Sequence, residues 1–186
     1  MLVVRRFFLA ALAAFAIPAG SAVAQDRLDV VATTGMIADA AREIGGEHVA
    51  VEALMGPGVD PHSYRQTRSD IVAMTRADLV LWHGLYLEAQ LEAFLLDLAG
   101  RQPVVAVAED LPRNLLIGHD DYDDKLDPHV WMNPNLWARV VTRIRDALIE
   151  VAPEHEAAFS ANADAHLEEL EQLATYTTQV LASVPA

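Results

Sequence analysis

The sequence predicts an α/β fold, a parallel four-stranded sheet with helices on both faces, followed by a long connecting helix. Three observations support this class. Four short apolar, β-branched runs recur along the chain, a helical pattern of apolar residues separates each run from the next, and glycine or proline marks most of the junctions. Strands that alternate with helices in this way form parallel sheets, because right-handed crossovers return the chain to the same edge.

The first half of the sheet comes from two strand-helix units. A strand over residues 28–32 precedes a helical pattern over 36–44, which two successive glycines end. The second strand spans 49–54 and stops at a Gly-Pro-Gly turn. Thr67 and Asp70 have the spacing of a capping box, so we expect the second helix to begin there.

The second half of the sheet has two apolar strands with a helix between them. The third strand, residues 79–82, shows no polar alternation, which is typical of a strand buried on both faces. The pattern then predicts a helix over 87–98, ended by Gly100, and a fourth strand over 103–107. Ligands of such sheets bind at the carboxyl ends of the strands, where the loops gather.

Two helices follow the sheet. Asn133 caps the first, Pro134 occupies its first turn, and its pattern continues to about residue 151. Pro153 interrupts the pattern, and residues 154–184 contain neither glycine nor proline. At 1.5 Å per residue this last helix is roughly 45 Å long, more than one small lobe needs. Its apolar face, expected to meet a partner or a second lobe, consists of Phe159, Ala163, Leu167, Leu170, Ala174, Thr177 and Leu181.

Residues 1–24 have the pattern of an export signal. Arg5 and Arg6 precede an apolar run over 7–17 that is too short to cross a bilayer, and small residues at 22–24 suit a cleavage site. The two arginines fit a twin-arginine signal in part, although an ordinary secretion signal is favoured. We therefore expect a periplasmic protein with no stable membrane insertion after the signal is cleaved.

We expect the mature chain to divide into an α/β lobe, residues 25–152, and a long helix, residues 153–186. It has no cysteine, which excludes disulfides and thiolate ligands. Removing the two signal arginines lowers the basic count from 13 to 11 against 27 acidic residues, a net charge of −16. Such a surface disfavours nucleic acid and favours solubility.

The tripeptide Asp-Pro-His occurs twice, ending at His62 and at His129, and each copy stands where a strand gives way to a helix. A neutral imidazole binds zinc, manganese or iron through one ring nitrogen, best when its orientation is already fixed. Proline supplies part of that fixing, and Asp60 or Asp127 could bond the second ring nitrogen or a nearby backbone N–H. Unrelated polar turns are the alternative for one copy alone, and the repetition favours a metal site.

The longest irregular segment lies between the fourth strand and the second tripeptide. It carries an acidic run that could gather metal ions for the two histidines. A solvated loop is the alternative, and it is favoured over a fixed calcium site because the spacing and glycine of a calcium loop are absent. The candidate residues of this accessory loop are His119, Asp120, Asp121, Asp123 and Asp124.

With these motifs in place, the chain resembles the N-terminal part of a periplasmic zinc/manganese-binding protein of a metal ABC transporter. Several independent motifs occur in the family's order, so the resemblance is specific, and together with the long helix they cover essentially the whole mature chain. The matching stretches are residues 31–34 (VATT), 58–64 (GVDPHSY), 77–88 (ADLVLWHGLYLE) and 127–132 (DPHVWM).

The resemblance implies a captor of one divalent ion, Zn²⁺ or Mn²⁺, held between two α/β lobes and handed to a membrane permease. His62 matches the family's first ligand and His129 its second, while the third and fourth belong to a second lobe, expected beyond Ala186. The missing lobe implies weak binding by this chain alone. Family members often have asparagine at the position of His83, which is therefore either a group behind the ligands or, as we favour, a polar residue at a strand end.

The choice of ion and two other functions stay open. Zinc members often carry a long His-rich loop before the second ligand, and the short acidic run here, with only His119, favours manganese or a general divalent site. A metallohydrolase is the rival class, but the sequence has no His-Glu-x-x-His helix and no evident general base, so we expect no enzyme activity. A metal-dependent adhesion or assembly module is the other alternative.

Overall fold

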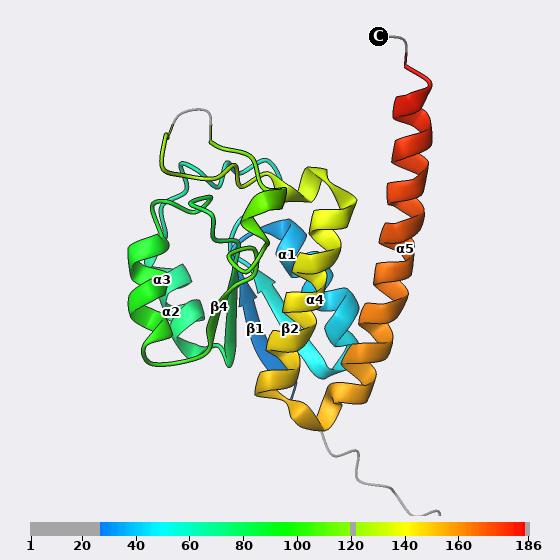
Figure 1. Ribbon diagram of the computed structural model, residues 1–186. Helices are drawn as coiled ribbons and strands as arrows, with labels where there is room; N and C mark the ends of the chain where they lie inside the picture. The colour runs from blue at the N-terminus through cyan, green and yellow to red at the C-terminus, as the bar shows by residue number, and fades with distance from the viewer. Residues whose placement is uncertain (1–26, 120–121, 185–186) are drawn as a thin grey trace, which may run out of the picture.

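The computed structural model describes residues 27–119 and 122–184. The predicted export signal and two acidic residues of the accessory loop, Asp120 and Asp121, lie outside this range. Figure 1 shows the arrangement: a central sheet, helices on either side, and one long helix that runs along the outside of the molecule. Within the described part, no helix is both long and apolar enough to cross a membrane.

The sheet has the predicted four parallel strands. They are β1 (Leu28–Ala32), β2 (Val49–Ala53), β3 (Leu79–Trp82) and β4 (Val104–Ala106), in the order β2-β1-β3-β4. In the register of the sheet, Val30 of β1 lies opposite Val51 on one side and Leu79 on the other. All four carboxyl ends therefore reach the same edge.

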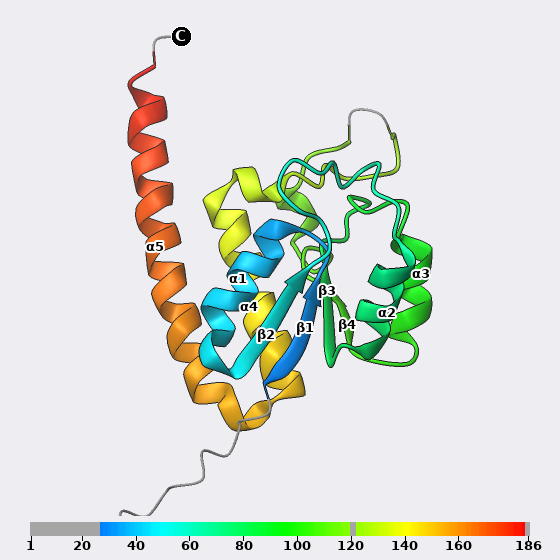
Figure 2. The ribbon, with the colours of Figure 1, turned by 180° about the vertical axis from the view of Figure 1, so that it is seen from behind.

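Helices cover both faces of the sheet, as predicted. Figures 1 and 2 place α1 (Gly35–Gly45) and α4 (Pro134–Val151) on one face, and α2 (Arg68–Arg76) and α3 (Glu92–Ala99) on the other. Each face has its own apolar core. The parallel strands thus lie between two layers, which explains why their sequences are apolar except at Asp29 of β1 and Glu52 of β2.

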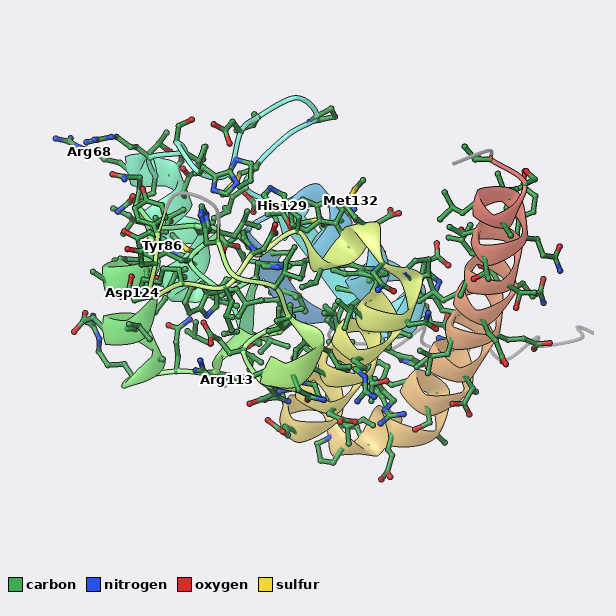
Figure 3. All side chains as sticks on the ribbon, turned by 45° about the horizontal axis from the view of Figure 1, so that its top comes forward. Arg68, Tyr86, Arg113, Asp124, His129 and Met132 are labelled. Atoms are coloured by element: carbon green, nitrogen blue, oxygen red, sulfur yellow. The ribbon has the colours of Figure 1, made fainter. Side chains whose placement is uncertain are left out.

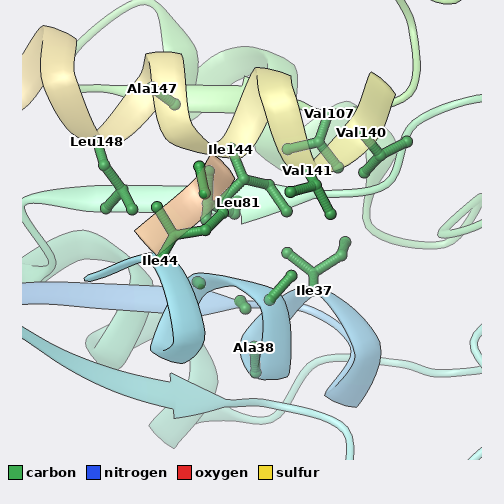
Figure 4. Close-up of a cluster of buried hydrophobic side chains, with 14 of the residues drawn as sticks. Ile37, Ala38, Ile44, Leu81, Val107, Val140, Val141, Ile144, Ala147 and Leu148 are labelled. Carbon is green, nitrogen blue, oxygen red and sulfur yellow. The ribbon is translucent and has the colours of Figure 1, made fainter. Parts of the chain in front are cut away.

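The larger core lies between the sheet, α1 and α4. Figure 4 shows side chains of the two helices meeting over β3, with Ile44 of α1 close to Ile144 of α4. Both isoleucines are fully buried, and burial of each such side chain stabilises the fold by about 1.5–3 kcal/mol. The core residues labelled there are Ile37, Ala38, Ile44, Leu81, Val107, Val140, Val141, Ile144, Ala147 and Leu148.

The predicted helix starts at Thr67 and Asn133 are confirmed in atomic detail. The backbone N–H of Asp70 donates to Thr67 Oγ1 at 3.3 Å, and the backbone N–H of Thr67 donates to Asp70 Oδ2 at 2.6 Å, which completes a capping box for α2. At α4, Asn133 Oδ1 accepts from the backbone N–H of Asn135 at 3.0 Å. Short polar side chains therefore satisfy amides that the helices leave free.

The predicted helix over 87–98 is wrong at its start, because α3 begins only at Glu92. The preceding residues form turns, and Gly84, Leu85 and Tyr86 have φ angles of 83°, 51° and 66°. These three residues lie just before the predicted start, and the turns continue through residue 91. The apolar spacing of this segment instead serves a buried turn, whose Leu87 and Leu91 side chains are fully buried.

The long helix, α5 (Glu156–Ala182), follows a 3₁₀ turn at Pro153–His155. Its first half packs on α1 and α4, burying Phe159, Ala163 and Leu170. Its second half stands clear of the other helices in both views, and Tyr176 is 64% exposed. The predicted apolar face is therefore covered by this lobe only over the first half of the helix.

Three further histidines, His48, His155 and His166, are half-buried. The rings of His48 and His155 stack with centroids 4.0 Å apart, at the base of α5, and both lie against Phe159. His166 lies on α5 with its Nδ1 atom 4.0 Å from Glu169. The sequence pattern missed the stack because its two rings come from corners of the chain more than a hundred residues apart.

Candidate metal centre

His62 and His129 lie together at the carboxyl edge of the sheet. His62 follows β2 in a turn, and His129 precedes a 3₁₀ turn at Val130–Met132 that leads into α4. Their Nε2 atoms are 3.4 Å apart, and both side chains are exposed. Figure 3 looks onto this edge, where His129 lies beside Met132. The structure thus brings together the two histidines that the repeated tripeptide singled out.

The separation of the two nitrogens suits a shared metal ion. Two ligands at about 2.1 Å from a tetrahedral metal lie about 3.4 Å from each other. The observed 3.4 Å between the Nε2 atoms matches that edge. Neither ring would have to move far to bind one ion.

Asp127 orients the ring of His129. Its Oδ1 atom lies 2.7 Å from His129 Nδ1 and accepts the backbone N–H of the same residue at 2.7 Å. Partial burial raises the pKa of Asp127, but these bonds and the charges of His129 and His119 outweigh it and leave the pKa lowered. An ionised carboxylate accepts the Nδ1–H proton, so the lone pair of the ring is on Nε2, the atom that faces His62.

Asp60 acts on the backbone of its histidine. Asp60 Oδ1 accepts from the backbone N–H of His62 at 3.0 Å, and Oδ2 accepts from the Ser63 hydroxyl at 2.9 Å. The bond from Ser63, then the one from His62, lowers the pKa of Asp60. The two tripeptides therefore differ, because Asp127 contacts a ring nitrogen and Asp60 shapes a turn.

Tyr64 anchors the His62 turn to α2, a contact that the sequence analysis missed. Its hydroxyl donates to Asp70 Oδ2 at 2.7 Å, the same oxygen that closes the capping box with Thr67. Burial, followed by the bond to Asp70, raises the pKa of Tyr64 to about 12. A tyrosine two residues after the histidine and six before Asp70 was the signal that could have found it.

His83 lies behind the site, fully buried at the end of β3. Its Nε2 atom is 2.7 Å from the carbonyl oxygen of Pro128, and its ring meets Trp131 edge-on at 5.4 Å between centroids. Burial lowers the pKa of His83 to about 4, against the effect of the Pro128 carbonyl, so the ring is neutral. It is therefore more than an exposed polar strand end.

Glu88 is another buried polar residue near the site, and the sequence analysis did not single it out. Its carboxyl group accepts from the Thr33 hydroxyl at 2.6 Å and from the backbone N–H groups of His83 at 2.8 Å and Gly84 at 3.3 Å. Burial raises its pKa despite these bonds. Glu88 thereby joins the ends of β1 and β3 beneath the two metal-facing loops.

The accessory loop approaches the site from one side. The ring centroid of Tyr122 lies 4.9 Å from that of His119 and 5.4 Å from that of Tyr86. Lys125 Nζ lies 4.7 Å from the centroid of the Tyr86 ring. Asp123 and Asp124 are exposed on the same loop. Across residues 27–119 and 122–184, no group of three or more histidine, aspartate or glutamate side chains is placed to hold a metal ion.

An apolar cavity of about 390 Å³ adjoins His129 and Asp127. Ile117 and Met132 line it and are 69% and 76% exposed. A larger cavity of about 760 Å³ lies between β2 and α2, away from the histidine pair. The pair of imidazoles therefore lies next to an exposed apolar surface formed in part by Ile117 and Met132.

Comparison with known proteins places this geometry in a family. A family model described as zinc-uptake complex component A, periplasmic, matches residues 30–186. The chain is 41% identical over 162 residues to the manganese-binding lipoprotein MntA of Bacillus subtilis, covering 87% of this chain and 53% of that protein. It is 36% identical over 157 residues to the zinc-binding protein TroA of Treponema pallidum, covering 84% and 50%.

Solved structures agree. The periplasmic zinc-binding protein TroA from Treponema pallidum superposes with a TM-score of 0.81 at 35% identity, over 86% of this chain and 57% of that one. Fe(III)-bound YtgA from Chlamydia trachomatis gives a TM-score of 0.76 at 30% identity, over 85% and 55%. The chain spans about half the length of the curated relatives it matches.

These matches confirm the resemblance that the sequence motifs indicated, and they extend over the sheet, both loops that carry the paired histidines, and the long helix. The chain belongs to the family of periplasmic zinc-uptake complex component A proteins.

Proposed function

We propose that this chain is the N-terminal lobe and connecting helix of an extracytoplasmic solute-binding protein. It captures one divalent transition-metal ion, zinc or manganese, and delivers it to the permease of an ABC transporter. The observation that carries this proposal is the 3.4 Å separation of His62 Nε2 and His129 Nε2 at an exposed edge of the sheet. The names of the relatives support it, since they describe binding of manganese, zinc or iron.

In this proposal each part of the site has one task. His62 and His129 bind the ion through Nε2, Asp127 keeps the proton of His129 on Nδ1, and Asp60 holds the turn of His62. Two imidazoles leave two positions of a tetrahedral site open. Water or groups outside the described residues fill them, so binding by this chain alone is weak.

The two imidazoles do not choose between ions, because nitrogen ligands suit zinc while manganese prefers added oxygen. The exposed carboxylates of Asp123 and Asp124 stand on the loop beside the site, and the chain as a whole is acidic. Negative charge of this kind attracts cations before they bind. A periplasmic location is proposed on the signal-like residues 1–24 and on the descriptions of the relatives as periplasmic proteins or lipoproteins.

Titration calorimetry on residues 25–186 with Zn²⁺ and Mn²⁺ tests this function. We expect micromolar or weaker binding of one ion, reduced at least about tenfold by His62→Ala or His129→Ala, because loss of a partner behind a ligand already costs that much. His166→Ala, on the outer helix, is the control and should bind as the unaltered chain does. Sub-micromolar binding that survives both site substitutions would contradict the proposal and place the ion elsewhere.

A further inference from the structure

His83 is a fully buried histidine whose side chain makes one hydrogen bond in the described structure. Its Nε2 atom lies 2.7 Å from the carbonyl oxygen of Pro128, the central residue of the tripeptide that ends at His129. A carbonyl only accepts, so Nε2 carries the proton and Nδ1 is left as an acceptor. Nδ1 has no hydrogen-bond partner among the described residues.

A histidine is a poor filler for this place. A buried acceptor without a partner loses its hydrogen bonds to water, a cost that an apolar side chain of similar size would avoid. Packing alone therefore favours leucine over histidine at this strand end. The bond from Nε2 to Pro128 is what histidine adds and leucine cannot.

That bond acts on the peptide unit that carries His129. The carbonyl of the Pro128–His129 peptide accepts from His83, and the N–H of the same peptide donates to Asp127 Oδ1 at 2.7 Å. One rigid plane is thus held from both sides. The Cα atom of His129 belongs to this plane and carries the ring whose Nε2 atom lies 3.4 Å from His62 Nε2.

The backbone of His83 is itself held by two hydrogen bonds. Its backbone N–H donates to the buried carboxyl group of Glu88 at 2.8 Å, and its carbonyl accepts from Ala108 at 2.9 Å. Trp131 contacts both His83 and His129, with its ring centroid 5.4 Å from that of His83 and 5.1 Å from that of His129. Motion of His129 would therefore be resisted by the core of the sheet.

We propose that His83 is a positioning residue for His129. Through the Pro128 carbonyl it fixes the 128–129 peptide, and so holds His129 Nε2 at the distance from His62 that one shared ion requires. The expected effect on metal binding rests on the proposed function. The expected effect on the ring of His129 rests on the hydrogen bonds alone.

Two substitutions separate the hydrogen bond from the packing. The side-chain amide of glutamine can reach the place of imidazole Nε2, so His83→Gln keeps a donor to Pro128, whereas His83→Leu fills the space without one. We expect His83→Leu to weaken Zn²⁺ binding by about 10–100-fold, the range for partners behind metal ligands. His83→Gln should stay within about threefold of the unaltered chain, and His166→Leu is the control for an unrelated histidine.

Nitrogen-15 NMR of the His129 ring in the metal-free chain gives a readout that does not depend on binding. The unaltered chain and His83→Gln should show a single Nδ1–H tautomer, and His83→Leu a mixture.

Equal Zn²⁺ affinities with an unchanged His129 tautomer in all variants would overturn the proposal. A loss of affinity in the glutamine variant equal to that in the leucine variant would also overturn it. If His83→Leu does not fold, the comparison of His83→Gln with the unaltered chain decides, because loss of the single tautomer in the folded glutamine variant also overturns it. If Zn²⁺ binding proves independent of His62 and His129, the proposed function fails while the tautomer still tests His83.

Discussion

His129 is bonded to Asp127 through one ring nitrogen and faces His62 with the other. The Nδ1 atom lies 2.7 Å from Asp127 Oδ1, and the Nε2 atom lies 3.4 Å from His62 Nε2. A carboxylate behind an imidazole fixes its tautomer and raises its basicity, which are the two properties that a metal ligand needs. In the proposed site, the ring of His129 is thus held by a carboxylate, whereas Asp60 holds only the backbone of His62.

The substitution Asp127→Asn should weaken Zn²⁺ binding by about 10–100-fold, because the negative charge behind His129 is removed while the size of the side chain is kept. Calorimetry measures the change. Asp123→Asn, which removes an exposed charge from the neighbouring loop, is the matched control and should change binding far less. Equal effects of the two substitutions would mean that only overall charge matters.

The same carboxyl group should make the fold sensitive to acid. In the folded chain its pKa lies below the ordinary aspartate value, because the hydrogen bonds from His129 outweigh the effect of partial burial, so folding favours the ionised form of Asp127. The stability that this provides is present above the unfolded pKa and is lost as pH falls through the folded pKa. In urea unfolding, the difference between the unaltered chain and Asp127→Asn should be constant above about pH 5 and shrink below about pH 4. A difference that grows on acidification would contradict this sign.

Tyr64 should ionise well above the pH at which a tyrosine side chain ordinarily does. Its pKa is raised to about 12, and the bond to Asp70 favours its neutral form. Stability from this group is present below the unfolded pKa of about 10 and is lost as pH rises through the folded value. Absorbance titration of the folded chain at alkaline pH should show one late tyrosine that Tyr64→Phe removes, and retention of that late step in Tyr64→Phe would assign it to another residue.

The first half of α5 should be essential to the lobe. Phe159 is fully buried among residues of the larger core, so Phe159→Ala should lower the free energy of unfolding by about 3–5 kcal/mol. Leu173, on the same helix but 48% exposed, is the comparison, and Leu173→Ala should change stability by less than about 1 kcal/mol. Chemical denaturation of both variants measures the contrast. Similar losses would show that the outer half is covered in solution.

The second half of α5 should exchange its amide hydrogens rapidly. The segment from Tyr176 onward has exposed apolar side chains, including Leu181 at 64% and Val184 at 61%, and it stands clear of the other helices. Isolated helical turns are marginal in water. Hydrogen exchange should therefore protect the amides around Ala163 and not those beyond Tyr176, unless light scattering shows that copies of the chain pair through this surface. A protected monomer would contradict both outcomes.

Much of the fold could be predicted because its signals are local. The bounds of the buried strand β3 were predicted correctly, because a run of four apolar residues between turn signals is typical of a buried strand. The caps at Thr67 and Asn133 follow from side chains adjacent to the helix starts. The start of α3 could not be predicted, because the turns over residues 85–91 bury Leu87 and Leu91 at a spacing that a helix would also produce.

The site was predicted only in part, for a related reason. The repeated tripeptide singled out His62 and His129, but identical tripeptides cannot reveal that Asp127 contacts a ring while Asp60 contacts a backbone. Glu88 was missed because its hydroxyl partner, Thr33, is 55 residues away in the sequence. Contacts of this kind are set by the packing of β1 against β3.

The most direct test is anomalous diffraction at the zinc absorption edge from crystals of residues 25–186 grown with Zn²⁺. We expect one strong peak at about 2.1 Å from both His62 Nε2 and His129 Nε2. The peak should vanish in the His62→Ala, His129→Ala double variant. A peak that instead lies against His119 and the neighbouring carboxylates, or that persists in the double variant, would contradict the claim that the two Asp-Pro-His turns form one metal site.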